Sequence, residues 1–256
     1  MTTATTSAWQ PAASVSAIEL NAKASPDFTA KLAETVALLR QAAAQGPTTL
    51  ACSLGAEDMV LADLINANEL PISIFVLETG ALHAETLALL EQLKTSQATR
   101  PYAPLTVYQP AQEAVIEFVA REGNEAMYKS IALRKACCGI RKMEPLGRAL
   151  AGQKGWLTGL RREQSGARAE VPLIDEGEVA TKGLTKFNPL ANWTWGDVWH
   201  YIGQNKVQYN PLHDQFFPSI GCAPCTRAIS MGEDFRAGRW WWEDEAAKEC
   251  GLHVKK

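Results

Sequence analysis

The chain has 256 residues, of which 46% are hydrophobic and 21% charged, so it is long enough to bury one substantial core. Its net charge of -3 argues against a broad nucleic-acid-binding face and leaves room only for a local basic pocket. The N-terminal residues lack a basic region followed by an apolar run, and no apolar run approaches the length of a membrane span. We therefore expect a protein of the cytoplasm that binds neither nucleic acid nor a membrane.

The first half of the chain alternates buried strands with helices. Residues 1–27, rich in Ala, Ser and Thr, predict a loosely ordered arm, and a helix follows over 28–44. The segment TTLACSLGAED predicts a strand that ends at Cys52, a turn at Gly55 and a helix that begins at Glu57. Further strands are predicted within 71–80 and 104–110, with helices over 81–95 and 111–123.

The second half continues this pattern and then becomes irregular. A helix is predicted to open near the cysteine pair at 137–138, followed by a strand and loop within 154–165 and a Trp-rich turn and helix over 188–205. From Tyr209 onward Pro and Gly interrupt the chain repeatedly. The alternation favours an open, mostly parallel sheet with helices on both faces, whose ligands bind at the carboxyl edge. We expect one α/β domain over 28–235 and a mobile C-terminal tail over 236–256.

Four of the six cysteines form two close pairs that lie far apart in the sequence. Cys137 and Cys138 are adjacent, where a disulfide between them would be strained, and Cys222 and Cys225 form a C-x-x-C pair. In a reducing compartment such pairs are more often metal ligands or redox groups than structural bridges. The spacing leaves open an iron-sulfur cluster, structural zinc, a redox dithiol at the second pair, and buried cysteines without chemistry.

Basic residues accompany these cysteines and two of the predicted loops. Lys142 follows Cys138 by one helical turn, which would place a cation beside thiolates or a bound anion. The SLGAED segment suits backbone amides that hold a phosphate, although it lacks the Lys-Ser/Thr of a Walker loop. Arginines in two further loops make an oxyanion pocket plausible. These arginines are Arg161, Arg162 and Arg168 in one loop and Arg236 and Arg239 in the other.

The two remaining cysteines differ in their surroundings. Cys52 ends an apolar strand, where a cysteine is usually a small buried hydrophobe. Cys250 lies near the end of the predicted tail, with Lys248 and His253 close by in the sequence. Cationic neighbours favour the thiolate, which is the nucleophilic form, and a tail can move between a substrate and an external reductant. The preceding RWWWEDEA segment is typical of an aromatic anchor for such a tail.

Five segments occur in an order that resembles the assimilatory adenylyl-sulfate reductases, the iron-sulfur branch of the phosphosulfate reductase family. They are SLGAED, LETG, CCGIRK with GCAPCT, GLRREQS and KECGLH. The resemblance implies an adenine nucleotide alpha hydrolase-like fold and one 4Fe-4S cluster on Cys137, Cys138, Cys222 and Cys225. It makes Cys250 the nucleophile, with Lys142, His253, Arg236 and Arg239 on the sulfate side. It places the nucleotide against Ser53, Leu54, Gly55, Ala56, Glu57, Glu78, Thr79, Gly80, Arg161 and Arg162.

The resemblance also implies a reaction and its partners. The Cys250 thiolate would attack the sulfur of adenosine 5′-phosphosulfate, AMP would leave, and reduced thioredoxin or glutaredoxin would release sulfite from S-sulfocysteine. The family's usual LDTG is LETG here, so Glu78 is one methylene longer than the usual Asp. Relatives that use the 3′-phosphorylated nucleotide generally lack the cluster cysteines, which favours the unphosphorylated substrate. The sequence leaves dual use and a homo-oligomer open.

Two rival functions come from other classes. A tRNA-thiolating enzyme also combines a nucleotide-binding sheet with cluster cysteines, but it needs an SGGxDS-type loop and an RNA-binding face, and this chain lacks the loop and is acidic. A noncatalytic iron-sulfur or zinc sensor has no need of Cys250 or the arginine loops. Replacement of Cys250 by Ser separates these functions, because a sensor keeps its output and a reductase does not.

Overall fold

The computed structural model describes residues 15–177 and 183–244, which form an α/β fold around one six-stranded sheet. The strand order is β3-β2-β1-β4-β6-β5, and every neighbouring pair is parallel except β5 and β6. The strands are β1 (Thr48–Ala51), β2 (Ser73–Leu77), β3 (Leu105–Tyr108), β4 (Gly155–Leu157), β5 (Ile174–Asp175) and β6 (Thr185–Phe187). The predicted mostly parallel sheet is therefore confirmed, and β5 and β6 were not predicted.

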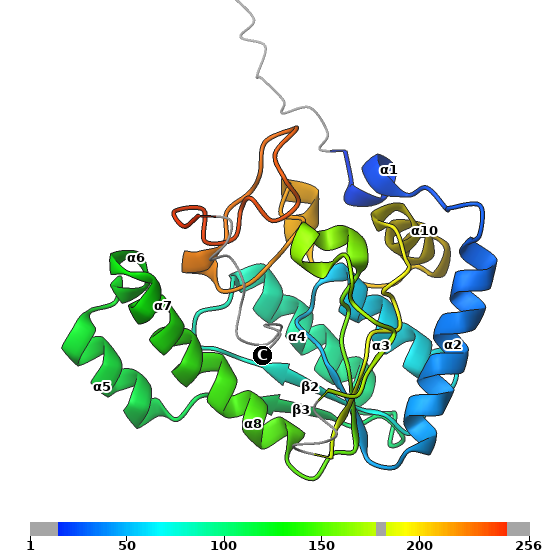
Figure 1. The fold of residues 1–256 in the computed structure, drawn as a ribbon, viewed down its shortest axis with the longest axis horizontal. Coiled ribbons are helices and arrows are strands. Elements are labelled where there is room, and N and C mark those ends of the chain that lie inside the picture. The colour runs from blue at the N-terminus through cyan, green and yellow to red at the C-terminus, as the bar shows by residue number, and fades with distance from the viewer. Residues whose placement is uncertain (1–14, 178–182, 245–256) are drawn as a thin grey trace, which may run out of the picture.

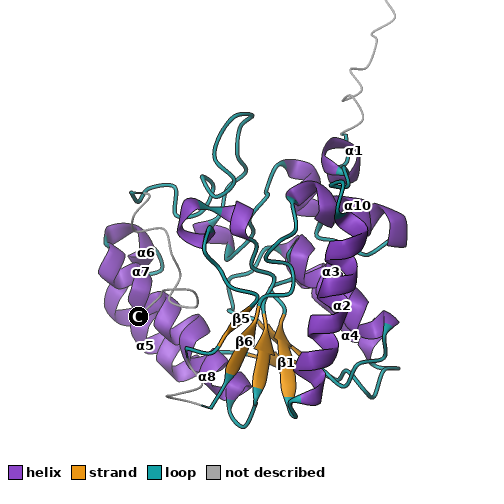
Figure 2. Ribbon diagram, turned by 45° about the vertical axis from the view of Figure 1, so that its right-hand side comes forward, coloured by secondary structure: helices purple, strands orange, loops and turns teal. Residues whose placement is uncertain are grey.

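Helices cover both faces of the sheet (Figures 1 and 2). One face carries α2 (Phe28–Ala44), α3 (Ala56–Ala67), α4 (Ala84–Gln97) and α10 (Trp195–Asn205). On the other side lie α5 (Gln112–Glu122), α6 (Ala126–Lys129), α7 (Ile131–Cys138) and α8 (Glu144–Leu150). None of the helices among the described residues is long and apolar enough to cross a bilayer.

Alternating side chains of β2 divide the core between these two layers. Ile74 and Val76 pack into the larger cluster with residues of α2, α3 and α4, whereas Phe75 packs into a smaller cluster with Leu146 of α8 and Trp156 of β4. This alternation follows from the two-residue period of a strand. Because both faces are covered, the open carboxyl edge of the strands is where a polar ligand can reach the sheet.

The segment predicted as a loosely ordered arm contains a helix, α1 (Ala17–Asn21). Ser16 and Glu19 form a capping box at its start, and the Ala17 N–H donates to Asp214 over 2.7 Å. Ala17 is buried in the large core cluster. Tertiary contacts thus stabilise a helix of a length that sequence periodicity does not reveal.

The helix that was predicted to open near the cysteine pair is longer and irregular. Ser130 caps α7, which ends with Cys137 and Cys138, and a π-helical turn over Gly139–Met143 joins it to α8. The Glu144 N–H reaches back to the Gly139 carbonyl, which widens this turn. Such turns are frequent at functional sites. Here the turn carries Lys142, directly after the cysteines.

Only the beginning of the predicted C-terminal tail lies within the described residues. Residues 236–244 pack onto the domain, and Trp240 and Glu243 are buried. Cys250 and His253, the two predicted catalytic residues of the tail, lie outside the described residues, so their roles remain predictions.

Candidate active site

A cavity of about 210 Å³ opens at the carboxyl edge of the sheet. Its lining comes from the ends of β1, β2 and β4 and from the C-terminal segments that fold over them. The lining includes polar and charged side chains that can form hydrogen bonds or ion pairs with an anion or a base. They are Ser53, Glu57, Asp58, Thr79, Thr86, Lys142, Thr158, Gln164, Arg168, His213, Ser219, Arg236 and Arg239.

The β1–α3 loop brings the start of α3 to this cavity. Leu54 adopts a left-handed backbone conformation with φ of 63°, and Gly55 is the N-cap of α3. Ser53, Gly55 and Glu57 line the cavity, whereas Leu54 and Ala56 are fully buried beneath it. The first amides of α3 therefore face the cavity edge, where a helix N-terminus favours an anion.

Asp58 holds this loop in its tight conformation. Its carboxylate accepts hydrogen bonds from the Ser53 N–H over 2.7 Å and the Ser53 hydroxyl over 2.5 Å. Burial raises the pKa of Asp58 to about 6, although the Ser53 hydrogen bonds oppose this shift. Burial and the neighbouring Asp58 also raise the pKa of Cys52, which keeps that thiol protonated. Asp58 thus acts on the shape of the loop while it lies at the cavity wall.

Gly159, just beyond β4, allows the sheet edge to approach α3. A Cβ at this position would lie 2.4 Å from the Asp58 Oδ1 and 2.8 Å from the Glu57 Cβ. No side chain fits in that space without a shift of the buried acidic residues. The absence of a side chain at 159 therefore shapes the floor of the cavity.

The arginines of the GLRREQS loop occupy three different environments. Arg161 is 1% exposed, donates to Glu57 over 2.9 Å, and its guanidinium packs against the rings of Trp195 and Phe235 at 5.2 and 5.5 Å. It supports the wall from behind and is not part of the lining.

Arg162 is exposed and donates to the Val171 carbonyl and the Asn192 side chain, away from the cavity. Arg168 is 7% exposed, donates to Gln164 over 2.6 Å and does line the cavity. Arg161 and Arg162 were the predicted substrate residues of this loop. The structure instead brings Arg168 to the cavity, and sequence spacing gave no signal that separated the three.

His213 is a lining residue that sequence reasoning missed. It is 6% exposed, and its ring packs against those of Trp195 and Trp199 at 5.8 and 5.2 Å. Burial lowers the pKa of His213 to about 4, so the ring is neutral near pH 7. It therefore offers one N–H donor and one acceptor nitrogen at the cavity wall.

The LETG loop connects the cavity to the cysteines. Glu78 does not line the cavity, because its carboxylate accepts from the Gly80 N–H over 2.6 Å and from Gln109 over 2.9 Å. Thr79 lines the cavity, and its hydroxyl lies 3.2 Å from the Cys222 sulfur. Gly80 has a φ of 68°, which the left-handed turn requires. Of the three predicted residues of this loop, the structure brings Thr79 to the cavity.

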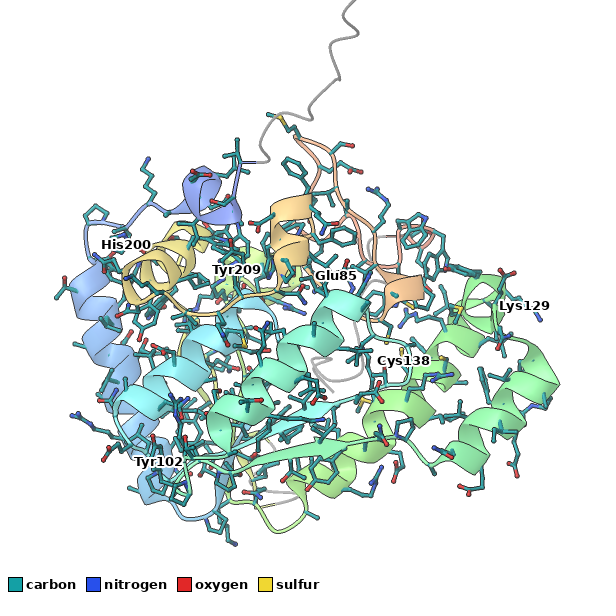
Figure 3. All side chains as sticks on the ribbon, turned by 180° about the vertical axis from the view of Figure 1, so that it is seen from behind. Glu85, Tyr102, Lys129, Cys138, His200 and Tyr209 are labelled. Atoms are coloured by element: carbon teal, nitrogen blue, oxygen red, sulfur yellow. The ribbon has the colours of Figure 1, made fainter. Side chains whose placement is uncertain are left out.

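A second cavity of about 110 Å³ is lined by all four clustered cysteines. Cys137 and Cys138 come from the end of α7, Cys222 is the N-cap of a short 3₁₀ turn over Ala223–Cys225, and Cys225 is the last residue of that turn. Cys138 lies on the same side of the molecule as α6 and its Lys129 (Figure 3). Within 15–177 and 183–244 no group of three His, Cys, Asp or Glu side chains is arranged around a single metal ion.

The chemistry of this donor set fits an iron-sulfur cluster. Burial raises the pKa of Cys137 and raises that of Cys225 to about 11, so both sulfurs are thiols unless a strong positive charge lies beside them. Arg141 and Lys142 oppose the shift at Cys137, and Lys142 and Arg239 oppose it at Cys225. Iron bound by four thiolates would supply the remaining positive charge. The cavity thus joins soft sulfur ligands to cations that balance an anionic cluster.

Lys142 lines both cavities, and Trp240 contributes to the lining of the first. Trp240 is 1% exposed and packs with Cys222 and Cys225. The Arg134 and Arg239 guanidinium groups lie over its ring at 4.6 and 4.7 Å. Arg134 lines the cysteine cavity, and Arg239 lines the larger cavity together with Arg236. The two predicted sites are therefore neighbours in space.

The open, mostly parallel sheet with helices on both faces and a cavity at its carboxyl edge is a fold of the adenine nucleotide alpha hydrolase-like class. The chain belongs to the phosphoadenosine phosphosulfate reductase domain family, whose model matches residues 47–228. The family resemblance found in the sequence is thereby confirmed.

Individual relatives agree with this family. A protein of Allochromatium vinosum named adenosine 5′-phosphosulfate reductase is 53% identical over 80% of this chain and 78% of its own length. A Neisseria meningitidis protein of the same name is 49% identical over 87% of this chain and 91% of its own. The crystal structure of phosphoadenylyl-sulfate reductase from Candida auris, a phosphate complex, matches with a TM-score of 0.60 at 25% identity. This structural match covers 79% of the present chain and 98% of the Candida auris chain.

Proposed function

We propose that the protein reduces adenosine 5′-phosphosulfate to sulfite and AMP in sulfate assimilation. The observation that carries the proposal is Lys142, which lines both the sheet-edge cavity and the cysteine cavity. Relatives about half identical over most of this chain are named adenosine 5′-phosphosulfate reductases, which supports this substrate. The reaction needs a nucleotide site, cations beside the sulfate and a sulfur nucleophile.

The nucleotide binds in the sheet-edge cavity. Its 5′-phosphate lies toward the start of α3, where Gly55 caps the helix, because helix N-termini favour anions. Arg168 adds a buried cation to this wall, and His213 offers a neutral donor and acceptor. Arg236 and Arg239, each 7% exposed, face the sulfate together with Lys142. This arrangement separates base recognition from sulfate activation.

The bond-forming step uses Cys250. Its thiolate attacks the sulfur of the sulfate group, the bond from sulfur to the bridging phosphate oxygen breaks, and AMP leaves with that electron pair. The protein then carries S-sulfocysteine. Charge moves onto the leaving phosphate in this step, and each positioned donor such as Lys142 can lower the barrier by roughly 2 to 4 kcal/mol. His253 in the same tail is the proposed proton carrier near the nucleophile.

Cys137, Cys138, Cys222 and Cys225 are the residues that would hold one 4Fe-4S cluster. Such a cluster supplies an anionic group with polarising iron beside Lys142. Lys142 and Arg239 balance its charge from the substrate side, while Arg134 and Arg141 do so from the helix side. The positive charge of Lys142 would therefore interact with both the cluster and the sulfate.

A protein dithiol completes the turnover. One thiolate of reduced thioredoxin or glutaredoxin attacks the Cys250 sulfur, sulfite leaves, and a mixed disulfide forms. The second thiol then displaces the Cys250 thiolate, so the partner leaves as a disulfide. Two electrons pass from the dithiol to the sulfate sulfur, and two protons are released. No other co-reactant is needed.

The experiment that tests the proposal is the mass of the Cys250 peptide after anaerobic incubation of the cluster-loaded protein with the nucleotide and no reductant. We expect one sulfite-derived group on Cys250, which reduced thioredoxin removes. A parallel incubation with the 3′-phosphorylated nucleotide shows which substrate reacts. The Cys250→Ser variant serves as control and should keep its iron while it forms no adduct. If neither nucleotide modifies the loaded protein, the reductase function is wrong, and the sensor and thiolation functions take its place.

A further inference from the structure

Three aromatic side chains form an exposed cluster beside the cysteine cavity. Tyr128 of α6 and Trp241 are 41% and 39% exposed, and the Trp242 ring contacts both, at 4.5 Å from Tyr128 and 4.7 Å from Trp241. We call these three residues the aromatic patch. Exposed aromatic clusters are uncommon on soluble proteins, and they often mark interaction surfaces. The proposed nucleotide chemistry does not use this patch.

The aromatic patch packs against residues that line the cysteine cavity. The Tyr128 hydroxyl donates to the Pro224 carbonyl over 2.6 Å, and Pro224 lies between the two cysteines of the C-x-x-C pair. Trp242 packs against the cluster of Met127, Cys222 and Cys225. Residues of the patch therefore contact the cysteine turn on one side and solvent on the other.

A buried ion pair fixes the patch to the domain. Glu243 follows Trp242 and accepts two hydrogen bonds from the Arg134 guanidinium, over 2.6 and 3.0 Å. Both side chains are almost fully buried, and Arg134 also stacks on Trp240. A bidentate pair of this kind specifies one geometry. The patch is thus a preorganised surface, which costs little ordering when a partner binds.

The patch lies within a short length of chain from Cys250. Only residues 245–249 separate Asp244 from Cys250 in the sequence. Six extended steps of chain span at most about 20 Å. Any protein that reacts with the Cys250 sulfur must therefore come within about 20 Å of Asp244, where the aromatic patch lies next to it in the sequence.

We propose that the aromatic patch docks the protein dithiol that reduces S-sulfocysteine, a small protein whose exposed thiols are bordered by an apolar surface. This inference rests on the proposed function. Transient redox complexes use small interfaces, in which a few aromatic anchors carry most of the binding energy. Tyr128 and Trp241 supply two such anchors on a surface that is already in place.

The test compares a protein dithiol with a small one. Sulfite release by the full-length, cluster-loaded Trp241→Ser variant is measured against increasing reduced thioredoxin and, separately, against increasing dithiothreitol. We expect the KM for thioredoxin to rise about fivefold to tenfold, because an interface anchor is lost. The KM for dithiothreitol and the single-turnover rate of Cys250 modification stay within about twofold of the parent, since neither needs the patch.

Two further variants separate docking from a loss of structure. Tyr128→Phe keeps the ring and should leave the KM for thioredoxin near that of the parent, whereas Tyr128→Ser should raise it. Met231→Ser is the matched control, because Met231 is 96% exposed outside the patch. It should change neither KM. Iron content of each variant shows that the cysteine site is intact.

Several results would overturn the inference. An unchanged KM for thioredoxin in Trp241→Ser shows that the patch is not the docking surface. An equal rise for dithiothreitol, or slower modification of Cys250, shows that the patch positions the protein's own tail. If the Trp241→Ser variant sediments with a lower mass than the parent protein, the patch joins copies of this chain. Failure of the proposed function is distinct, because the parent protein would then gain no sulfite-derived group at all.

Discussion

The two cavities of this protein are built by different means. The sheet-edge cavity takes its shape from loops at strand ends, with polar groups held by buried hydrogen bonds such as Ser53 to Asp58. The cysteine cavity is formed by helix ends and a 3₁₀ turn and has basic side chains around sulfur. Among the described residues only Lys142 lines both. The proposed nucleotide binding and the proposed sulfate activation therefore depend on different cavities, and Lys142 is the side chain that the two cavities share.

The largest expected effect comes from a substitution that disrupts the cysteine cavity and leaves the sheet-edge cavity intact. The Cys225→Ala variant should lose its bound iron and all measurable sulfite production, because the remaining three thiols cannot complete the ligand set. Its affinity for AMP should stay within about threefold of the parent, since no cysteine of the quartet lines the sheet-edge cavity. Iron analysis and calorimetric titration with AMP check this. A parallel loss of AMP binding would contradict the separation of the two cavities.

The next effect concerns stability of the nucleotide side. Arg161→Met should lower the free energy of unfolding by about 3 to 5 kcal/mol, because the buried Glu57 carboxylate then lacks its charged partner. Urea denaturation measures this loss. Arg162→Met is the control and should change stability by less than about 0.5 kcal/mol, because Arg162 is exposed. Equal effects of the two variants would show that Arg161 does not support the cavity wall.

A smaller effect is expected on AMP binding, and it distinguishes an arginine that lines the cavity from one that does not. Arg168→Ala should weaken AMP binding about 10- to 100-fold, because a buried charged donor is lost from the lining. Iron content should not change. The Arg162→Ala control should bind AMP within about twofold of the parent, because Arg162 does not line the cavity. Indistinguishable affinities for the two variants would refute the position given to Arg168.

The smallest predicted effect is a pH dependence of stability. Folded Asp58 keeps its proton up to about pH 6, above its ordinary pKa of 3.8, because it is buried. Between these pH values the folded state binds more protons than the unfolded state, so stability falls as pH rises through this window and stays lower above it. Asp58→Asn should remove that fall and raise stability at pH 7.5 by about 1 to 2 kcal/mol.

Urea denaturation of both proteins at several pH values checks the Asp58 prediction. The comparison uses the difference between the two proteins, so that other titrating groups cancel. Glu57 and Cys52 are the titratable neighbours of this carboxyl. An identical pH slope for the parent and Asp58→Asn would show that Asp58 does not carry the effect.

Much of the fold was predictable because its central elements have strong periodicity. The strands β1 to β4 and the helices α3, α4 and α5 follow apolar runs and turn residues in the sequence, whereas α6 and α7 were not predicted. β5 and β6 have two and three residues, which is too short for a two-residue period to be seen. α1 depends on a contact with Asp214, nearly two hundred residues away in the sequence, which no local pattern encodes.

The candidate site was predictable where a residue type implies its chemistry. Two cysteine pairs predicted one sulfur site, and all four line one cavity. Side-chain direction was not predictable, since Arg161, Arg162 and Arg168 share a loop but only Arg168 reaches the cavity. Glu78 is turned toward Gly80 and Gln109 by hydrogen bonds that only the fold creates. His213 had no motif around it, and its position depends on packing against two tryptophans.

The most direct test of the account measures single-turnover formation of S-sulfocysteine in Lys142→Ala. Because Lys142 lines both cavities, we expect this rate to fall on the order of 100- to 1,000-fold, with iron content and AMP affinity nearly unchanged. Lys142→Arg, which keeps the positive charge, should recover part of the rate. An unaltered rate in Lys142→Ala would contradict the claim that this side chain joins the two sites.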